Sequence, residues 1–119
     1  MYMLSSSKDN SVRLWDIRAA KPLRCFKGHH NTSKNFVRAR FGPGRGQVVS
    51  GSEDGIVYVW DLESARLMQK LRGHDAVCYD AAWNDKLSVL ASCSHDGSVC
   101  AWHYDPNVDA AAAGSGLPR

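Results

Sequence analysis

The sequence predicts an all-β fold in which a unit of about 42–45 residues occurs roughly two and a half to three times. Three observations favour this fold. Residues 4–16, 49–61 and 91–103 align with one another without gaps. Their tryptophans, Trp15, Trp60 and Trp102, recur at intervals of 45 and 42 residues. Short apolar runs end at Asp-Gly or Asp-Asn turn signals, and such short, punctuated runs disfavour helices.

Each unit contains a predicted hairpin. The first strand of the hairpin is predicted at residues 47–50 in the second unit and at residues 89–92 in the third. In the first unit, the chain begins inside this strand, at residues 2–4. An alternating second strand follows the turn, with Val12 and Leu14 in the first unit, Ile56, Tyr58 and Trp60 in the second, and Val99 and Ala101 in the third. Further strands are expected at residues 23–26 and 67–71, and before the hairpins at 36–41 and 77–83. A complete unit therefore holds four strands.

Polar residues recur at fixed offsets in all three segments. A serine is followed after four residues by an aspartate and, six residues later, by the tryptophan; the sets are Ser5, Asp9, Trp15; Ser50, Asp54, Trp60; and Ser92, Asp96, Trp102. Gly28-His29 and Gly73-His74 precede the second and third segments. So many coincidences indicate a true internal repeat.

The Gly-His pairs, the Ser-x-x-x-Asp spacing and the Trp-Asp pairs at Trp15-Asp16 and Trp60-Asp61 resemble the WD-repeat family of β-propellers. The resemblance covers about residues 3–104 and implies blades of four antiparallel strands. The third repeat departs from it with Trp102-His103, and the first lacks its Gly-His and its leading strand. The sequence around Gly28-His29, at residues 50–54 and at residues 67–71 is also loosely similar to the last blades of histone-methyltransferase-associated WD-repeat scaffolds.

The repeats divide the chain into a WD-repeat region at 1–104 and a flexible C-terminal tail at 105–119. Within the region we expect a partial blade at 1–27, a blade at 28–72 and a blade at 73–104. Propellers close with 4–8 blades, so the chain is expected to be a fragment. We expect the missing remainder to lie N-terminal of Met1, with Arg119 near the genuine C-terminus.

The resemblance implies that the recurring histidine, serine, aspartate and tryptophan form a structural hydrogen-bonded tetrad in each blade. These are His29, Ser50, Asp54, Trp60 and His74, Ser92, Asp96, Trp102, with Ser5, Asp9 and Trp15 as a set that lacks its histidine. Two imidazole nitrogens can bridge an aspartate and a serine hydroxyl, which also receives the indole N–H. A fully satisfied network of this kind pins loops to strands.

No catalytic, cofactor or metal site is expected. A Ser-His-Asp triad is the competing interpretation of the tetrad, but a nucleophile is needed once, whereas this set recurs in every repeat. The four cysteines contain no C-x-x-C pair, so zinc is disfavoured. Adjacent His29 and His30 lack a completing ligand nearby. No phosphate-binding glycine loop is present.

Composition and charge narrow the remaining classes of protein to which the chain could belong. The chain has 119 residues, 44% hydrophobic and 23% charged, which is ordinary for a globular protein. No apolar run approaches the roughly 18 residues of a transmembrane helix, and no secretory signal opens the chain. Free thiols and an intracellular location, in cytoplasm or nucleus, are therefore expected. The net charge of +3 conceals a basic N-terminal half and an acidic C-terminal half.

We expect a non-catalytic scaffold, a subunit of a multiprotein complex, that binds a protein or peptide through the top face of the propeller. Carried over by alignment, the candidate contact residues are Lys8, Glu53, His95, Asn35, Val37, Val77 and Tyr79. Tyr79 is the strongest anchor because it combines apolar area with a polar tip; ordinary packing between blades is the alternative for it. A nucleic-acid-binding module that uses the basic half is the alternative function. Its candidate residues are Lys34, Arg38, Arg40 and Arg45, near the aromatic Phe36 and Phe41.

Overall fold

The computed structural model describes residues 1–32, 36–42, 44 and 46–103, and their strands form three antiparallel sheets. The predicted all-β fold is confirmed. The strands are β1 Tyr2–Ser7, β2 Ser11–Asp16, β3 Lys21–Phe26, β4 Ala39–Phe41, β5 Gln47–Ser50, β6 Ile56–Asp61, β7 Leu67–Arg72, β8 Cys78–Asn84, β9 Val89–Ser94 and β10 Val99–His103. Within this part of the chain, no helix is long and apolar enough to cross a membrane.

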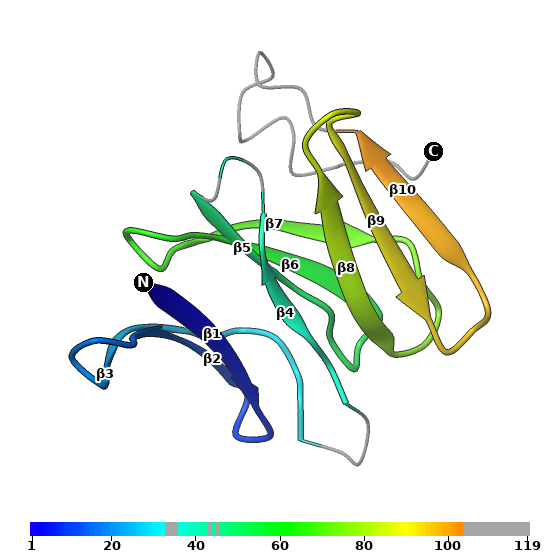
Figure 1. The fold of residues 1–119 in the computed structure, drawn as a ribbon. Coiled ribbons are helices and arrows are strands. Elements are labelled where there is room, and N and C mark those ends of the chain that lie inside the picture. The colour runs from blue at the N-terminus through cyan, green and yellow to red at the C-terminus, as the bar shows by residue number, and fades with distance from the viewer. Residues whose placement is uncertain (33–35, 43, 45, 104–119) are drawn as a thin grey trace.

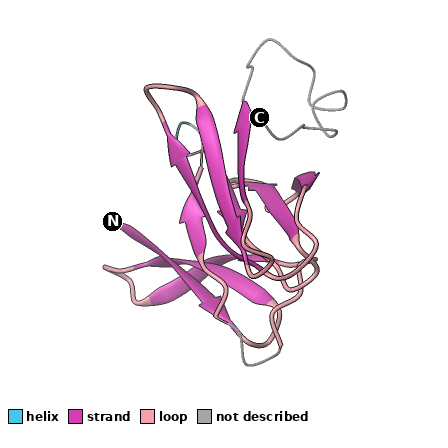
Figure 2. Ribbon diagram, turned by 90° about the vertical axis from the view of Figure 1, so that its right-hand side faces the viewer, coloured by secondary structure: helices cyan, strands magenta, loops and turns pink. Residues whose placement is uncertain are grey.

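The three sheets follow one another along the chain and stand side by side (Figures 1 and 2). The first has the order β1-β2-β3, the second β4-β5-β6-β7, and the third β10-β9-β8. Strand β4 packs against β1 of the first sheet and β8 of the third. The second sheet therefore has the complete four-stranded unit that the sequence predicts, whereas the described residues give the first and third sheets three strands each.

Strand β4 begins later than predicted, at Ala39 instead of residue 36. Phe36 is 81% exposed, the carbonyl of Val37 accepts a hydrogen bond from the Ser6 hydroxyl at 2.9 Å, and the N–H of Arg38 donates to the carbonyl of Tyr79 at 2.9 Å instead of to β5. The approach to this strand is thus held by β1 and β8 of the neighbouring sheets. In contrast, β5 spans the predicted residues 47–50.

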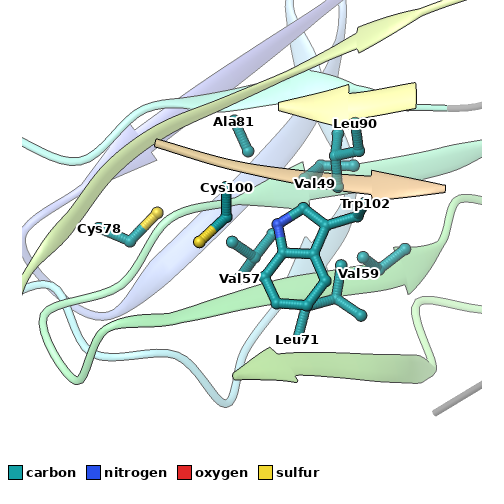
Figure 3. Close-up of a cluster of buried hydrophobic side chains, with 9 residues drawn as sticks. All are labelled: Val49, Val57, Val59, Leu71, Cys78, Ala81, Leu90, Cys100 and Trp102. Atoms are coloured by element: carbon teal, nitrogen blue, oxygen red, sulfur yellow. The ribbon is translucent and has the colours of Figure 1, made fainter. Parts of the chain in front are cut away.

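Two hydrophobic clusters hold neighbouring sheets together. Val12, Leu14, Phe26, Val48, Tyr58 and Trp60 form the cluster between the first and second sheets. Val49, Val57, Val59, Leu71, Cys78, Ala81, Leu90, Cys100 and Trp102 form the cluster between the second and third sheets (Figure 3). Strand β6 contributes to both clusters, which explains its uninterrupted apolar run. Burying each such valine stabilises the fold by about 1.5–3 kcal/mol relative to exposure.

In β10 the buried face differs from the alternation noted in the sequence. Cys100 and Trp102 are buried in the second cluster, whereas Val99 is 74% exposed. Because side chains alternate along a strand, burying Trp102 turns Val99 and Ala101 to the opposite face.

Candidate functional site

The third repeat contains a closed hydrogen-bond network around His74. Its Nε2 lies 2.7 Å from the Ser92 hydroxyl, which also accepts the Trp102 indole N–H at 3.0 Å. Its Nδ1 lies 2.8 Å from the Ser98 hydroxyl, which donates to the Asp96 carboxylate. Because Ser98 donates to Asp96, Nδ1 of His74 carries the proton, and Nε2 accepts from Ser92. The structure thus brings His74, Ser92 and Trp102 together directly.

Ser98 is the member of this network that the sequence analysis missed. Asp96 stands 4.0 Å from Nδ1 of His74, so the serine hydroxyl relays between them. The signal was present in the sequence, because Ser11 lies two residues after Asp9, as Ser98 does after Asp96. In the first repeat, Ser11 likewise donates to Asp9.

The first repeat retains the part of the network that needs no histidine. The Trp15 indole N–H donates to the Ser5 hydroxyl at 2.8 Å, the counterpart of the bond from Trp102 to Ser92. Asp9 lies on the β1–β2 turn, and Arg13 pairs with it at 3.3 Å. Hydrogen bonding from Ser11 is the largest influence that lowers the pKa of Asp9.

The structure does not join the second set by hydrogen bonds. Both ring nitrogens of His29 are buried without a hydrogen-bond partner among the described residues. The Trp60 indole donates to the carbonyl of Lys27 at 2.9 Å, and the Ser50 hydroxyl donates to the carbonyl of Gly51 at 2.8 Å. His29 instead meets the ring of Trp60 edge-on, with centroids 5.3 Å apart.

Two sequence differences account for this arrangement. Ile56 stands where the third repeat has the relaying Ser98, and it has no hydroxyl to link Asp54 to His29. Tyr58 stands where the third repeat has Cys100, and its hydroxyl donates to Asp54 at 2.6 Å. Burial and this bond raise the pKa of Tyr58. Burial tends to raise the pKa of Asp54, but hydrogen bonds from Tyr58, Ser52 and Ile56 outweigh it and lower the pKa.

The turns that follow β1, β5 and β9 lie at one end of the sheets, toward the bottom of Figure 1. Backbone contacts link them through the segments that enter β4 and β8. Asn31 donates its N–H to the Asn10 side chain at 2.7 Å, Glu53 to the carbonyl of His30 at 2.9 Å, and Asp75 to the Asp96 carboxylate at 2.8 Å. Lys8, Glu53 and His95 occupy equivalent positions on these turns. We call the surface that carries Lys8, Glu53, His95 and Tyr79 the turn face.

Side chains on the turn face contact one another or the adjoining loops. The Tyr79 hydroxyl lies 2.8 Å from Nδ1 of His95, and the two rings meet edge-on with centroids 6.0 Å apart. The Glu53 carboxylate accepts the N–H of Thr32. The Lys8 ammonium lies 4.9 Å from the centre of the Phe36 ring. The turn face therefore presents one cation, one anion and a Tyr-His pair within a single surface.

The other candidate contact residues are placed differently. Val37 is buried, at 5% exposure, and faces the molecule's interior instead of solvent. Val77 is half-buried, and its carbonyl accepts the N–H of His95 at 2.9 Å. Asn35 and the predicted tail at 105–119 lie outside the described residues. Among the predicted residues that the structure describes, Lys8 and His95 are thus exposed, Glu53, Val77 and Tyr79 are half-buried, and Val37 is buried.

Among the described residues, no three histidine, cysteine or acidic side chains gather as metal ligands. The cysteines are free thiols, with Cys78 and Cys100 buried and Cys25 and Cys93 exposed. Burial raises the pKa of Cys78 to about 12, which keeps it protonated and unreactive.

Comparison with protein families identifies the repeat. The family model described as "WD domain, G-beta repeat" matches residues 1–16, 20–61 and 65–103. This chain belongs to the WD40 family. The matched model describes the repeat itself and not a particular scaffold. A search of curated proteins found no match to the chain.

The three WD40 matches are offset from the three sheets. Each match ends at β2, β6 or β10, and the second and third matches begin with β3 and β7, which are the last strands of the preceding sheets. WD40 repeats generally mediate protein–protein interactions within complexes, and WD40 domains are typically non-enzymatic scaffolds. The hydrogen-bonded network at His74 suits this architectural role, because it ties the segment that enters β8 to the β9–β10 hairpin.

Proposed function

We propose that this chain is a non-catalytic scaffold that binds protein or peptide partners through the turn face, within a multiprotein complex. The observation that carries the proposal is the Tyr79–His95 pair at the start of β8 and the β9–β10 turn. An aromatic ring with a polar tip contributes large contact area and one directed hydrogen bond, which are the properties of interface anchors.

The variation among equivalent turn positions supports recognition over architecture. The position holds lysine in the first repeat, glutamate in the second and histidine in the third, although the turns themselves share one backbone form. Positive φ values at Asn10, Gly55 and Gly97 mark that shared form. A constant backbone with changing charge presents a patterned surface to a partner.

Nucleic-acid binding through the basic half is less well supported. The Arg40 guanidinium is already paired with the Asp80 carboxylate, through two hydrogen bonds of 2.8 and 2.9 Å. Acidic Asp54, Asp75 and Asp96 lie beside the turn face and would repel phosphates. A binding assay titrated with salt separates the two functions, because phosphate contacts lose affinity steeply with salt.

The proposal is tested by quantitative partner capture with the full chain as bait. Tyr79→Ala and His95→Ala should each reduce recovery of the captured proteins severalfold, because each removes half of the anchor pair. Leu87→Ala is the matched control, since Leu87 is 69% exposed on the β8–β9 turn at the other end of the sheet. Equal recovery with all three variants would remove the turn-face assignment.

A further inference from the structure

Strand β7 forms the outer edge of the second sheet. It is the last strand in the order β4-β5-β6-β7 and packs chiefly on β6, whereas β4 at the other edge contacts β1 and β8 of the neighbouring sheets (Figure 1). Among the described strands, none pairs with the outer side of β7. This side therefore presents backbone N–H and C=O groups that can pair with an added strand.

Strand β7 is better suited to such pairing than its counterpart in the first sheet. Strand β3 contains Pro22, which has no N–H to donate, whereas β7 contains neither proline nor glycine. Leu67 and Met68, at the start of β7, are exposed and apolar. They offer contact area to a strand that lies beside them.

Cations line this edge on the face that is directed at the first sheet. Lys70 stands opposite Tyr58, and Arg72 stands opposite Ile56. Tyr58 packs in the cluster between the first and second sheets, and the Lys70 ammonium lies 5.7 Å from the centre of its ring. Because side chains alternate along a strand, Lys70 and Arg72 share one face of β7. Both side chains are exposed, so a neighbouring strand can reach them.

Arg24 contributes a further cation from the facing side of the same junction. It stands opposite Leu14, which packs in the cluster between the two sheets, so Arg24 is directed at the second sheet. Its Nε donates to the carbonyl of Glu63 on the β6–β7 turn at 2.6 Å. The junction between the first and second sheets therefore carries cations from both sides.

The charge of these cations selects the kind of strand that fits the edge. Among the described residues, none of Arg24, Lys70 and Arg72 forms a salt bridge. The Asp61 carboxylate at the end of β6 is held by the N–H and hydroxyl of Ser64. A second copy of β7 would bring like charges together, and phosphates would meet the carbonyl oxygens of the edge. An acidic polypeptide matches both the cations and the backbone groups.

We propose that an extended acidic segment of a partner protein pairs with the outer edge of β7 and places carboxylates, on alternate residues, beside Lys70 and Arg72. Side chains two residues apart on the added strand share one face, as the two cations do on β7. Arg24 lies on the facing side of the junction toward which these carboxylates point. This inference rests on the proposed function, because it takes the chain to act by binding other proteins, but its surface contains neither Tyr79 nor His95.

The probe is a capped peptide as long as β7, in which glutamate and valine alternate, and it is titrated into the full chain. When the peptide is extended, all of its carboxylates lie on one face. Binding should slow hydrogen exchange severalfold at the β7 amides that point away from β6, and the β7 amides already bonded to β6 should not change. Absence of binding, or binding without protection of β7, would overturn the proposal.

Two controls of matched charge separate strand geometry from general attraction. A peptide of the same composition in Glu-Glu-Val-Val blocks spreads its carboxylates over both faces and should bind about fivefold more weakly. Lys70→Gln/Arg72→Gln in the protein should abolish this preference. Arg18→Gln/Lys86→Gln, which removes the same charge from two exposed turn residues, should keep it. Equal affinity for the two peptides, or loss of the preference in both double variants, would mean that net charge alone attracts the peptide, contrary to the proposal.

Other occupants of the edge give distinct results. Binding of oligothymidylate more tightly than of the acidic peptide, lost in Lys70→Gln/Arg72→Gln, would assign the cations to nucleic acid. Protection of the β7 amides that rises with protein concentration, without peptide, would assign the edge to a second copy. Either result would overturn the proposal. Tyr79→Ala should bind the peptide as the wild type does, so this test and the test of the turn face fail independently.

Discussion

His29 and His74 occupy equivalent positions in consecutive repeats but have opposite hydrogen-bond environments. His74 bonds to Ser92 and Ser98, whereas neither ring nitrogen of His29 has a partner among the described residues. His74→Leu removes a partner from the buried Ser92 hydroxyl and from the half-buried Ser98 hydroxyl, and should lower the free energy of unfolding by about 2 kcal/mol. His29→Leu removes unsatisfied polar atoms and should leave that free energy unchanged or raise it. Urea unfolding of both variants measures the difference, and equal losses would contradict it.

His29 should also make the free energy of unfolding depend on pH. Burial lowers the pKa of His29 below 6.5, and His30 adds to this, whereas Asp54 and Asp9 oppose it. Well above pH 6.5 the residue is neutral in both the folded and the unfolded state. Below it, the unfolded chain binds a proton that the folded chain resists, so the free energy of unfolding falls as the pH falls. His29→Leu should flatten this decline, measured by urea midpoints between pH 7.5 and about pH 5.5, and an equally steep decline in the variant would contradict the assignment to His29.

At the scale of the element, the tight turns between hairpin strands set the strictest local demands. Gly55 and Gly97 both have positive φ, of 81° and 85°. A Cβ on Gly55 would lie 2.6 Å from the carbonyl oxygen of His74, whereas a Cβ on Gly97 would meet nothing within 4 Å. Gly97→Ala should therefore cost about 1 kcal/mol of unfolding free energy, from backbone strain alone. Gly55→Ala should cost more, about 3 kcal/mol.

The matched pair of glycine variants is measured by thermal or urea unfolding. Gly97→Asn is a further control, because Asn10 adopts a positive φ of 65° at the same position of the first repeat. It should be tolerated better than Gly97→Ala. Equal destabilisation by alanine at positions 55 and 97 would show that the close approach of the His74 carbonyl has no energetic consequence.

The hairpins were predictable because their turns have local chemical causes. Asp-Gly and Asp-Asn signals located the β1–β2, β5–β6 and β9–β10 turns, and β5 has the predicted bounds. The start of β4 was not predictable, because the backbone there makes long-range bonds: the Arg38 N–H donates to the carbonyl of Tyr79, and the Val37 carbonyl accepts from Ser6. Local patterns carry no information about such contacts.

The candidate site, too, could be predicted only in part. The resemblance supplied the residue types of each tetrad, and the third repeat joins His74, Ser92 and Trp102 as hydrogen-bond chemistry suggests. It could not supply the neighbours that complete or replace the network. In the third repeat, the Ser98 hydroxyl bonds to His74. In the second repeat Ile56 takes the place of that serine, and the ring nitrogens of His29 have no hydrogen-bond partner among the described residues.

At the scale of the whole molecule, two shared clusters hold the sheets together, and some edges have no partner among the described strands. Strand β10 pairs with β9 on one side only among the described strands, and its Val99 is 74% exposed. An apolar side chain on an unpaired edge favours association between chains, and a charge there opposes it. We therefore expect the chain to self-associate in a concentration-dependent way, seen by size-exclusion chromatography with light scattering.

Val99→Lys should shift this association toward monomer, because the added charge would have to be buried against a second copy. Leu87→Lys is the matched control: Leu87 is similarly exposed, at 69%, but lies on the β8–β9 turn and not on an edge strand. If both substitutions reduce association equally, general charge and not the β10 edge governs it. A wild-type chain that is monomeric at every concentration and melts cooperatively would show that its open edges are harmless in solution, and that three unequal sheets suffice for an independent fold.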